Sequence, residues 1–324
     1  MRRLSIAPQA RFFLKLAFLL VIIGYAAHSI DIPSFISGIR QVRSGIYLGS
    51  VSLTVIYFAG LALTTNYLMG IFGVRTNYAD MVILNYVTIF YAHVSQAIGT
   101  LHRWIALSGP LGRRGEAAIV IVYERLQSFF ICLLYLCLVA FFGVGKELTY
   151  PFLGVLAWTG VGCLIAIGLG MTCLRSFVYL LVSSIKSWSW KSEWIRRVFD
   201  DAKRVIEMVG RMSMRQHLTA ALPQILCSML ILVRFYMLAH SVNEPLSWPA
   251  VIALYALVRL VEVVPFFIMG IGLQEGIFVF LLPHLGMSRE GAVLFALMHL
   301  GNVFILVVIG GVLSLLRRKP HAQN

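Results

Sequence analysis

The sequence predicts an all-α polytopic membrane protein, and three observations carry that prediction. Of the 324 residues, 60% are hydrophobic and only 12% are charged, and the mean hydropathy is +0.87. A soluble domain is typically about 45–50% apolar and about 25% charged. Apolar stretches of about 20 residues, enough to cross about 30 Å of hydrocarbon, recur along the whole chain. The alternating pattern of a membrane β-barrel does not appear. We therefore expect one membrane domain over residues 1–324.

Apolar runs define the expected elements in chain order. The first run follows a basic leader and ends in Ala26-Ala27-His28-Ser29, a poor cleavage site, so we expect an uncleaved helix rather than a signal peptide. About six spanning helices are expected, at residues 12–30, 46–69, 118–142, 151–171, 218–240 and 291–316. Two further stretches, 78–114 and 249–285, are weakly hydrophobic in part or broken by Pro and Gly, and do not fit single spans.

Basic residues are concentrated in the connectors. The loop 172–217 holds nine Lys and Arg residues and both terminal segments are basic, whereas 241–248 carries only Glu244. This bias places both termini and the loop in the cytoplasm of a bacterial inner-membrane protein. Apolar residues at helical spacing over 192–210 favour an amphipathic helix on the membrane surface, or else a solvated linker helix. The net charge of +14 thus suits lipid headgroups, and we expect no nucleic-acid binding.

Chain parity, meaning the side of the membrane that the chain must reach after each span, constrains the two interrupted stretches. If Arg75 and the pair Arg113-Arg114 are both cytoplasmic, residues 78–114 must enter and leave the membrane on one side. Residues 249–285 must do the same from the other side for the tail to end in the cytoplasm. We therefore predict two membrane-dipping hairpins of opposite orientation, an arrangement found in transporters built from an inverted repeat.

Several polar side chains fall inside apolar stretches, where a charge costs about 2.5–3.5 kcal/mol on insertion scales. They are Glu124, Arg125, Arg234, Arg259, Glu262, Glu275 and His299. Arg259 and Glu262 are three apart and can form a structural ion pair, while Arg125 can extend to the membrane surface. His299 suits an interhelical hydrogen bond or, alternatively, a proton relay. The five cysteines all lie in apolar stretches without a CxxC pair, so we expect no metal or cofactor site.

The most informative break runs from Pro265 through Gly270 and Gly272 to Gly276. Proline removes a backbone donor and glycine permits conformations closed to other residues, so the helix is expected to unwind here. Unwound backbone at membrane depth must be buried in protein or line a wet cavity. A helix restarting near Gly276 would present N–H groups that favour an anion such as phosphate, with Glu275 as an alternative cap.

These residues resemble a known family signature. Pro265, Gly270, Gly272, Glu275 and Gly276, followed by an apolar run and Leu285-Gly286-Met287-Ser288, are similar to the transmembrane region of the lysylphosphatidylglycerol synthase family. The resemblance extends to the first half through Gly99, Arg103 and Glu124-Arg125. It implies a flippase-like membrane domain without the aminoacyl-transferase domain of larger members. Three departures bear on the transported headgroup: Gln274 stands where the family usually has Arg, Ser128 replaces an acidic residue, and no Pro precedes Gly99.

The leading functional hypothesis is a lipid flippase-like protein that passes a phospholipid or lipid-linked headgroup between leaflets. Arginines would attract the phosphate, because guanidinium forks match phosphate oxygens, and carboxylates would orient them. The expected partners are anionic or phosphate-bearing lipids. The expected substrate-binding residues are Arg103, Glu124, Arg125, Arg234, Arg259, Glu262, Pro265, Gly270, Gly272, Gln274, Glu275, Gly276 and His299.

Two alternatives remain open. The chain is either a non-catalytic partner of a glycosyltransferase or lipid synthase, using the basic loop around Trp194, or a membrane transferase acting on a lipid carrier. The sequence offers no DxD and no HExxH motif, which disfavours metal-dependent chemistry. His93, His102 and His299 are the remaining residues that could converge in space. We therefore expect no enzymatic activity.

Overall fold

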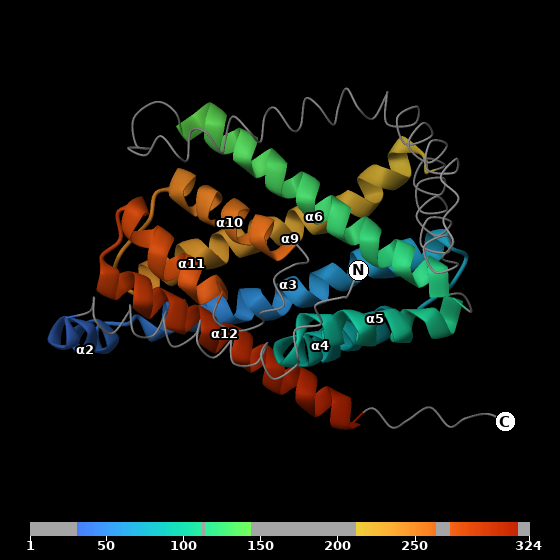
Figure 1. Cartoon of the computed structure of the whole chain (residues 1–324), viewed down its shortest axis with the longest axis horizontal. Coiled ribbons are helices and arrows are strands. Elements are labelled where there is room, and N and C mark those ends of the chain that lie inside the picture. Colours follow the sequence, from blue (N-terminus) through green and yellow to red (C-terminus); the bar gives the residue numbers. More distant parts are fainter. Residues whose placement is uncertain (1–30, 112–113, 144–211, 264–272, 317–324) are drawn as a thin grey trace, which may run out of the picture.

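The computed structural model describes residues 31–111, 114–143, 212–263 and 273–316, all built from helices and short connectors (Figure 1). The α-helices are α2 (Ile32–Arg40), α3 (Ser44–Ile71), α4 (Tyr78–Val94), α5 (Gln96–Leu111), α6 (Arg114–Gly143), α9 (Met214–Ser241), α10 (Trp248–Val263), α11 (Leu273–Leu281) and α12 (Arg289–Leu316), with a 3₁₀ turn η1 (Leu282–Leu285) after α11. The spans expected at 12–30 and 151–171 and the amphipathic segment 192–210 lie outside the described residues.

Four helices in the described part of the chain are long and apolar enough to cross a membrane. Their spans are Ser44–Ile71, Gly115–Val139, Arg215–Ser241 and Arg289–Leu316, in agreement with four of the expected spans. At about 1.5 Å per residue, each exceeds the roughly 30 Å of a hydrocarbon core. On α9 the exposed side chains Leu218, Leu222 and Leu226 follow one another at one-turn spacing. Such a stripe is suited to lipid rather than to water.

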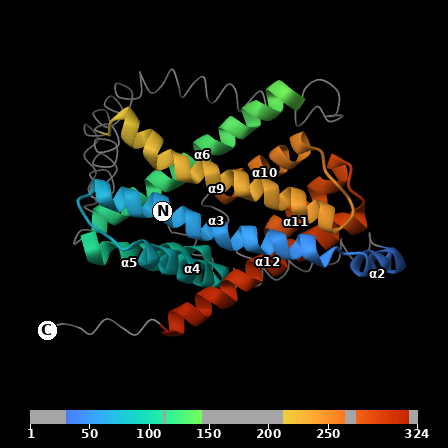
Figure 2. The same ribbon diagram turned by 180° about the vertical axis from the view of Figure 1, so that it is seen from behind.

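The stretch 78–114 forms a helical hairpin, as predicted. Helix α4 ends at Val94, Ser95 adopts an extended backbone, and α5 starts at once and returns beside α4 (Figures 1 and 2). Gly99 makes this close return possible, because a Cβ there would lie 2.6 Å from the Cβ of Ala92 and 2.8 Å from its backbone nitrogen. The structure places the break between the two helices at Ser95.

One end of the bundle brings three connectors together. The backbone N–H of Arg43 donates to the carbonyl of Ser241 at 2.9 Å, so the start of α3 meets the end of α9. The backbone N–H of Ser288 donates to the Glu244 carboxylate at 2.5 Å, so the start of α12 meets the connector that precedes α10. Helix α10 therefore begins, and η1 ends, at this same end.

The opposite end holds the base of the other hairpin. Met212, just before α9, packs against an apolar cluster built from the end of α3, the start of α4, the end of α5 and the start of α6. Its buried members include Leu68, Met81, Leu107 and Ala117. Hairpin α4–α5 and the pair α10–α11 thus enter the bundle from opposite ends, as the parity argument predicts (Figure 2). The residues that join α10 to α11, 264–272, lie outside the described residues.

Replacement of Gly291 by alanine is expected to release the contact between Glu244 and α12. The new Cβ would overlap the Glu244 carboxylate, whose Oε2 would lie 2.6 Å away, and would force it off the Ser288 N–H. We expect a loss of about 1–3 kcal/mol in unfolding free energy, from overpacking and the lost charge-assisted bond. Thermal unfolding in detergent measures this loss of unfolding free energy. Gly45→Ala is the matched control, because a Cβ at Gly45 would meet nothing within 4 Å. Equal melting temperatures for the two variants would contradict this role for Gly291.

Candidate functional site

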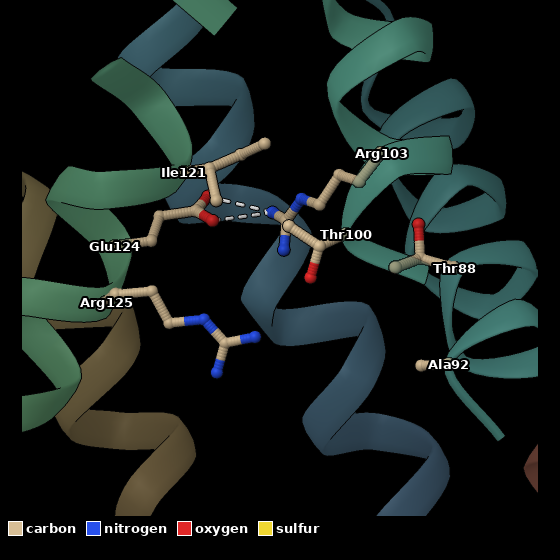
Figure 3. Close-up of a pocket in the computed structure, with 7 residues that line it drawn as sticks. All are labelled: Thr88, Ala92, Thr100, Arg103, Ile121, Glu124 and Arg125. Carbon is tan, nitrogen blue, oxygen red and sulfur yellow. Dashed lines mark hydrogen bonds and ion pairs between the residues drawn. The ribbon is translucent and has the colours of Figure 1, made fainter. Parts of the chain in front are cut away.

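An ion pair joins three helices inside the bundle. Arg103 Nη2 on α5 lies 2.7 Å from Oε2 and 3.0 Å from Oε1 of Glu124 on α6 (Figure 3). The Thr65 hydroxyl on α3 donates to Glu124 Oε1 at 2.6 Å and accepts from Arg103 Nη2 at 2.7 Å. The hairpin predicted from chain parity is therefore tied to the spanning helices through charged side chains.

The pair is largely shielded, since the Arg103 and Glu124 side chains are 21% and 13% exposed. Removing charges from water is costly, and their attraction offsets this only with good geometry and additional hydrogen bonds. Thr65 supplies such a bond. Arg103 Nε lies buried and has no hydrogen-bond partner among the described residues.

Arg103 also lines a small pocket between α6 and the α4–α5 hairpin. The pocket has a volume of about 50 Å³ and is lined by Thr88, Ala92, Thr100, Arg103, Ile121, Glu124 and Arg125. Figure 3 shows the Arg125 guanidinium extending from α6 toward the α4–α5 side of this space, with the Thr100 hydroxyl directed into it. Arg125 is exposed and also lines this pocket, so both interpretations of it, extension to the membrane surface and substrate binding, stay predictions.

A second polar cluster surrounds Arg259 on α10. Its guanidinium donates to the Tyr57 hydroxyl and lies 5.3 Å from the Tyr57 ring centre and 5.7 Å from that of Tyr255. Stacking of this kind suits arginine, whose planar group carries little hydration. The cluster lines a smaller pocket with Leu61, Ser128, Ile131, Gln224 and Ser228.

Gln224 on α9 connects the two clusters. Its amide nitrogen donates to the backbone carbonyl of Glu124 at 3.3 Å and to the hydroxyl of Ser128. Ser128 is the position where the family resemblance calls for an acidic residue. The structure therefore gives this departure a role, because a neutral hydroxyl accepts the amide where a carboxylate would add a second negative charge beside Glu124.

The region around His299 lies where α12 meets α11. His299 is 3% exposed and packs against the rings of Phe278 and Phe235, with ring centres 4.8 Å and 6.0 Å away. Its Nδ1 lies 4.0 Å from Glu275 Oε1, which is too far for a hydrogen bond. Arg234 is equally buried, at 4% exposure. The relay hypothesis for His299 stays a prediction.

The structure thus sorts the predicted site residues. It brings Arg103, Glu124 and Arg125 to one pocket, Arg259 to a second, and His299 to Glu275. Glu275 lies in the first turn of α11, flanked by Gln274 and Gly276, where a carboxylate is favourable. Pro265, Gly270 and Gly272 and the side chain of Glu262 lie outside the described residues. Within the part of the chain that the structure describes, no group of three metal-binding side chains occurs, so the three histidines form no such site there.

Sequence reasoning missed several residues of these pockets, namely Tyr57, Thr65, Thr88, Thr100, Gln224 and Tyr255. Hydroxyl and amide side chains are common in membrane helices, so their presence alone gave little signal. Helical spacing did give a signal for two of these residues, because Tyr57 and Thr65 are two turns apart and share a face of α3 with Leu61.

The comparison with protein families decides the assignment. The family model described as "Lysylphosphatidylglycerol synthase TM region" matches residues 12–311. The chain belongs to this family. The match covers both hairpins, three of the four described spans in full and the fourth up to residue 311. It confirms the resemblance drawn from Pro265–Gly276 and makes the chain a multi-pass membrane protein. Comparisons with curated proteins and with solved structures gave no match.

Proposed function

We propose that the protein is a lipid flippase-like translocator that passes a phosphate-bearing lipid headgroup between the leaflets of the inner membrane. The observation that supports this most directly is the pair of opposed hairpins with arginines placed between them and the spanning helices. Family membership agrees with the proposal, since this membrane domain is often linked to lipid flipping.

The physical requirement is a polar route inside an apolar exterior. A headgroup phosphate crossing the hydrocarbon needs donors to replace its hydration, and guanidinium groups supply several at fixed geometry. Arg103 and Arg259 are half-buried in the bundle and Arg125 is exposed, and all three line pockets that also contain neutral hydroxyls. The acyl chains would stay against outer faces such as the leucine stripe of α9, so only the headgroup would enter the protein.

We further propose that the base of α4–α5 faces the cytoplasm, with both termini on that side. Loop charge supports this orientation, because the basic loop ends at α9 beside that base. The pocket of Arg103 and Arg125 would then receive headgroups from the cytoplasmic leaflet. The proposal assigns the chain no catalytic step, so the lipid should leave chemically unchanged.

Reconstitution tests the proposal. Purified protein is reconstituted in vesicles that contain a fluorescent phospholipid, and a membrane-impermeant quencher is added outside. The protein should speed the quenching of the inner-leaflet label, because flipping brings that label to the outer leaflet. Lipid analysis should show no new product. Arg259→Ala and Glu275→Gln should reduce this rate at least about tenfold, because each removes a charge placed at the proposed headgroup route.

Arg75→Ala, at an exposed connector residue, is the control for a general loss of positive charge. Full activity of the Arg259 and Glu275 variants would show that these two residues do not lie on the proposed headgroup route. An absence of flipping by the wild-type protein would favour the alternative of a non-catalytic partner.

A further inference from the structure

The pocket between α6 and the α4–α5 hairpin has the donor set of an oxyanion site. We propose that it binds one phosphate group of a phospholipid through Arg103, Arg125, Thr88 and Thr100, with Glu124 and Thr65 as positioning residues. This inference rests on the proposed function. It adds a specific headgroup-binding site and identifies phosphate as the group that binds there.

Glu124 and Thr65 contact only one nitrogen of the Arg103 guanidinium, and its other N–H groups can bind a ligand. Both short contacts to Glu124 and the contact to Thr65 use Nη2, whereas Nε is buried and has no hydrogen-bond partner among the described residues. A guanidinium has five N–H donors in a rigid fork, so one group can hold a carboxylate and a phosphate at the same time. Glu124 need not leave for the ligand to bind, which avoids the cost of a buried carboxylate without a counter-ion.

Thr88 gives an independent indication of a ligand. Its Oγ1 is buried at the pocket and has no hydrogen-bond partner among the described residues. A buried hydroxyl without a partner is unfavourable, and Arg103 Nε in the same pocket shares this property. Two donors without partners at one pocket are what a group rich in acceptor oxygens would satisfy.

Size and chemistry restrict the occupant. The pocket is small, at about 50 Å³, which suits a compact group such as phosphate. Ala92 and Ile121 complete its wall and offer no acceptor side chains, while the guanidinium of Arg125 extends toward the pocket space from the α6 side (Figure 3). Phosphate is the oxyanion that lipids carry, and Arg pairs are its most geometrically suited donors.

The decisive experiment compares two threonine-to-valine variants. Thr88→Val removes only the hydroxyl at the pocket. Thr64→Val removes a hydroxyl on α3 that is also buried without a partner among the described residues and lines neither pocket. Neither change should lower stability, since neither hydroxyl has a bond to lose. The probe is dihexanoyl phosphatidylglycerol, and its affinity for the purified full chain is measured by titration in detergent.

We expect Thr88→Val to weaken binding of the probe about tenfold, as befits one hydrogen bond to a charged group, and Thr64→Val to leave it unchanged. Arg103→Lys should weaken it by a similar factor, because lysine keeps the charge beside Glu124 but lacks the second donor edge. Dihexanoyl glycerol, which has no phosphate, should bind wild type and Thr88→Val equally.

Equal affinities of the two valine variants for the phospholipid would overturn the proposal. Inorganic phosphate that binds as tightly as the phospholipid and is equally sensitive to Thr88→Val would also overturn it, in favour of a soluble oxyanion. If Thr88→Val selectively weakens phospholipid binding but the protein flips no lipid, the binding site is supported and the translocation function is not. The two proposals can therefore fail separately.

Discussion

Replacement of Arg103 by alanine is expected to lower the free energy of unfolding by about 3–5 kcal/mol, one of the largest effects of any single substitution in the described bundle. The Glu124 carboxylate would stay shielded, at 13% side-chain exposure, and would keep only the Thr65 hydroxyl as a donor. An uncompensated charge in such a place costs far more than the pair contributes, because attraction and desolvation nearly cancel while both partners are present.

Thermal unfolding of the purified protein in detergent measures this loss. The matched control is the double variant Arg103→Met with Glu124→Leu, which removes both charges and fills similar space. Its stability should return to within about 1–2 kcal/mol of wild type, since a buried ion pair replaced by apolar residues is often nearly neutral. A double variant as unstable as Arg103→Ala would show that the pair itself, rather than an unpaired charge, governs stability.

Replacement of Gly310 by alanine is expected to cost about 3 kcal/mol, because it separates α12 from the α4–α5 hairpin. A Cβ at this position would overlap the backbone carbonyl oxygen of Tyr86 and lie 2.9 Å from its carbonyl carbon. Backbone cannot rotate away as a side chain can, so α4 itself would have to shift. Phe90 lies in the same contact, with its Cβ 3.1 Å from the added atom.

Two glycines of the same molecule provide graded controls. A Cβ at Gly311 would meet only the ring of Phe90, at 3.2 Å, and a ring can move by a few tenths of an ångström, so the cost should be smaller. A Cβ at Gly70 near the end of α3 would meet nothing within 4 Å, so alanine should be neutral or stabilise by up to about 1 kcal/mol. Melting temperatures that do not fall in the order Gly70, Gly311, Gly310 would contradict this account of the helix contact.

The Gly310 contact also bears on transport. Helix α12 holds the hairpin through the same segment that carries Tyr91, whose hydroxyl lies 3.4 Å from that of Ser314. The pocket of Arg103 lies on the other side of this hairpin, toward α6. A hairpin fixed between α12 and α6 keeps its arginine at one position, which a preorganised binding site requires.

Much of the architecture followed from the sequence. Parity and loop charge predicted two hairpins of opposite orientation, and the contacts of Ser288 with Glu244 and of Met212 with its cluster place their bases at opposite ends. The boundary at Ser95 has a local cause, because the extended turn and Gly99 together bring α5 against α4 without a long connector. Hydropathy averaged over a span does not locate such a turn, because apolar residues predominate in both helices.

The candidate site followed only in part. Glu124 and Arg125 stood out as charges in an apolar stretch, and Arg103 came from the family resemblance. Arg103 and Glu124 are 21 positions apart, and Thr65 is 38 from Arg103. Nothing in the spacing of these residues indicates that they form one cluster. Thr88 was missed for the same reason, because a threonine in a membrane helix becomes informative only when its hydroxyl proves to be buried without a partner among the described residues.

The sequence by itself determined the class of the protein, the four spans that the structure describes and the ends from which the two interrupted stretches enter the bundle. These properties depend on segment length, apolar content and loop charge, which are local and additive along the chain. The tertiary structure decided which polar side chains meet. A nearly uniformly apolar helix carries little information about which face it buries, so its rotation is set by small residues such as Gly310 that let neighbours approach, and by rare charged pairs such as Arg103 with Glu124.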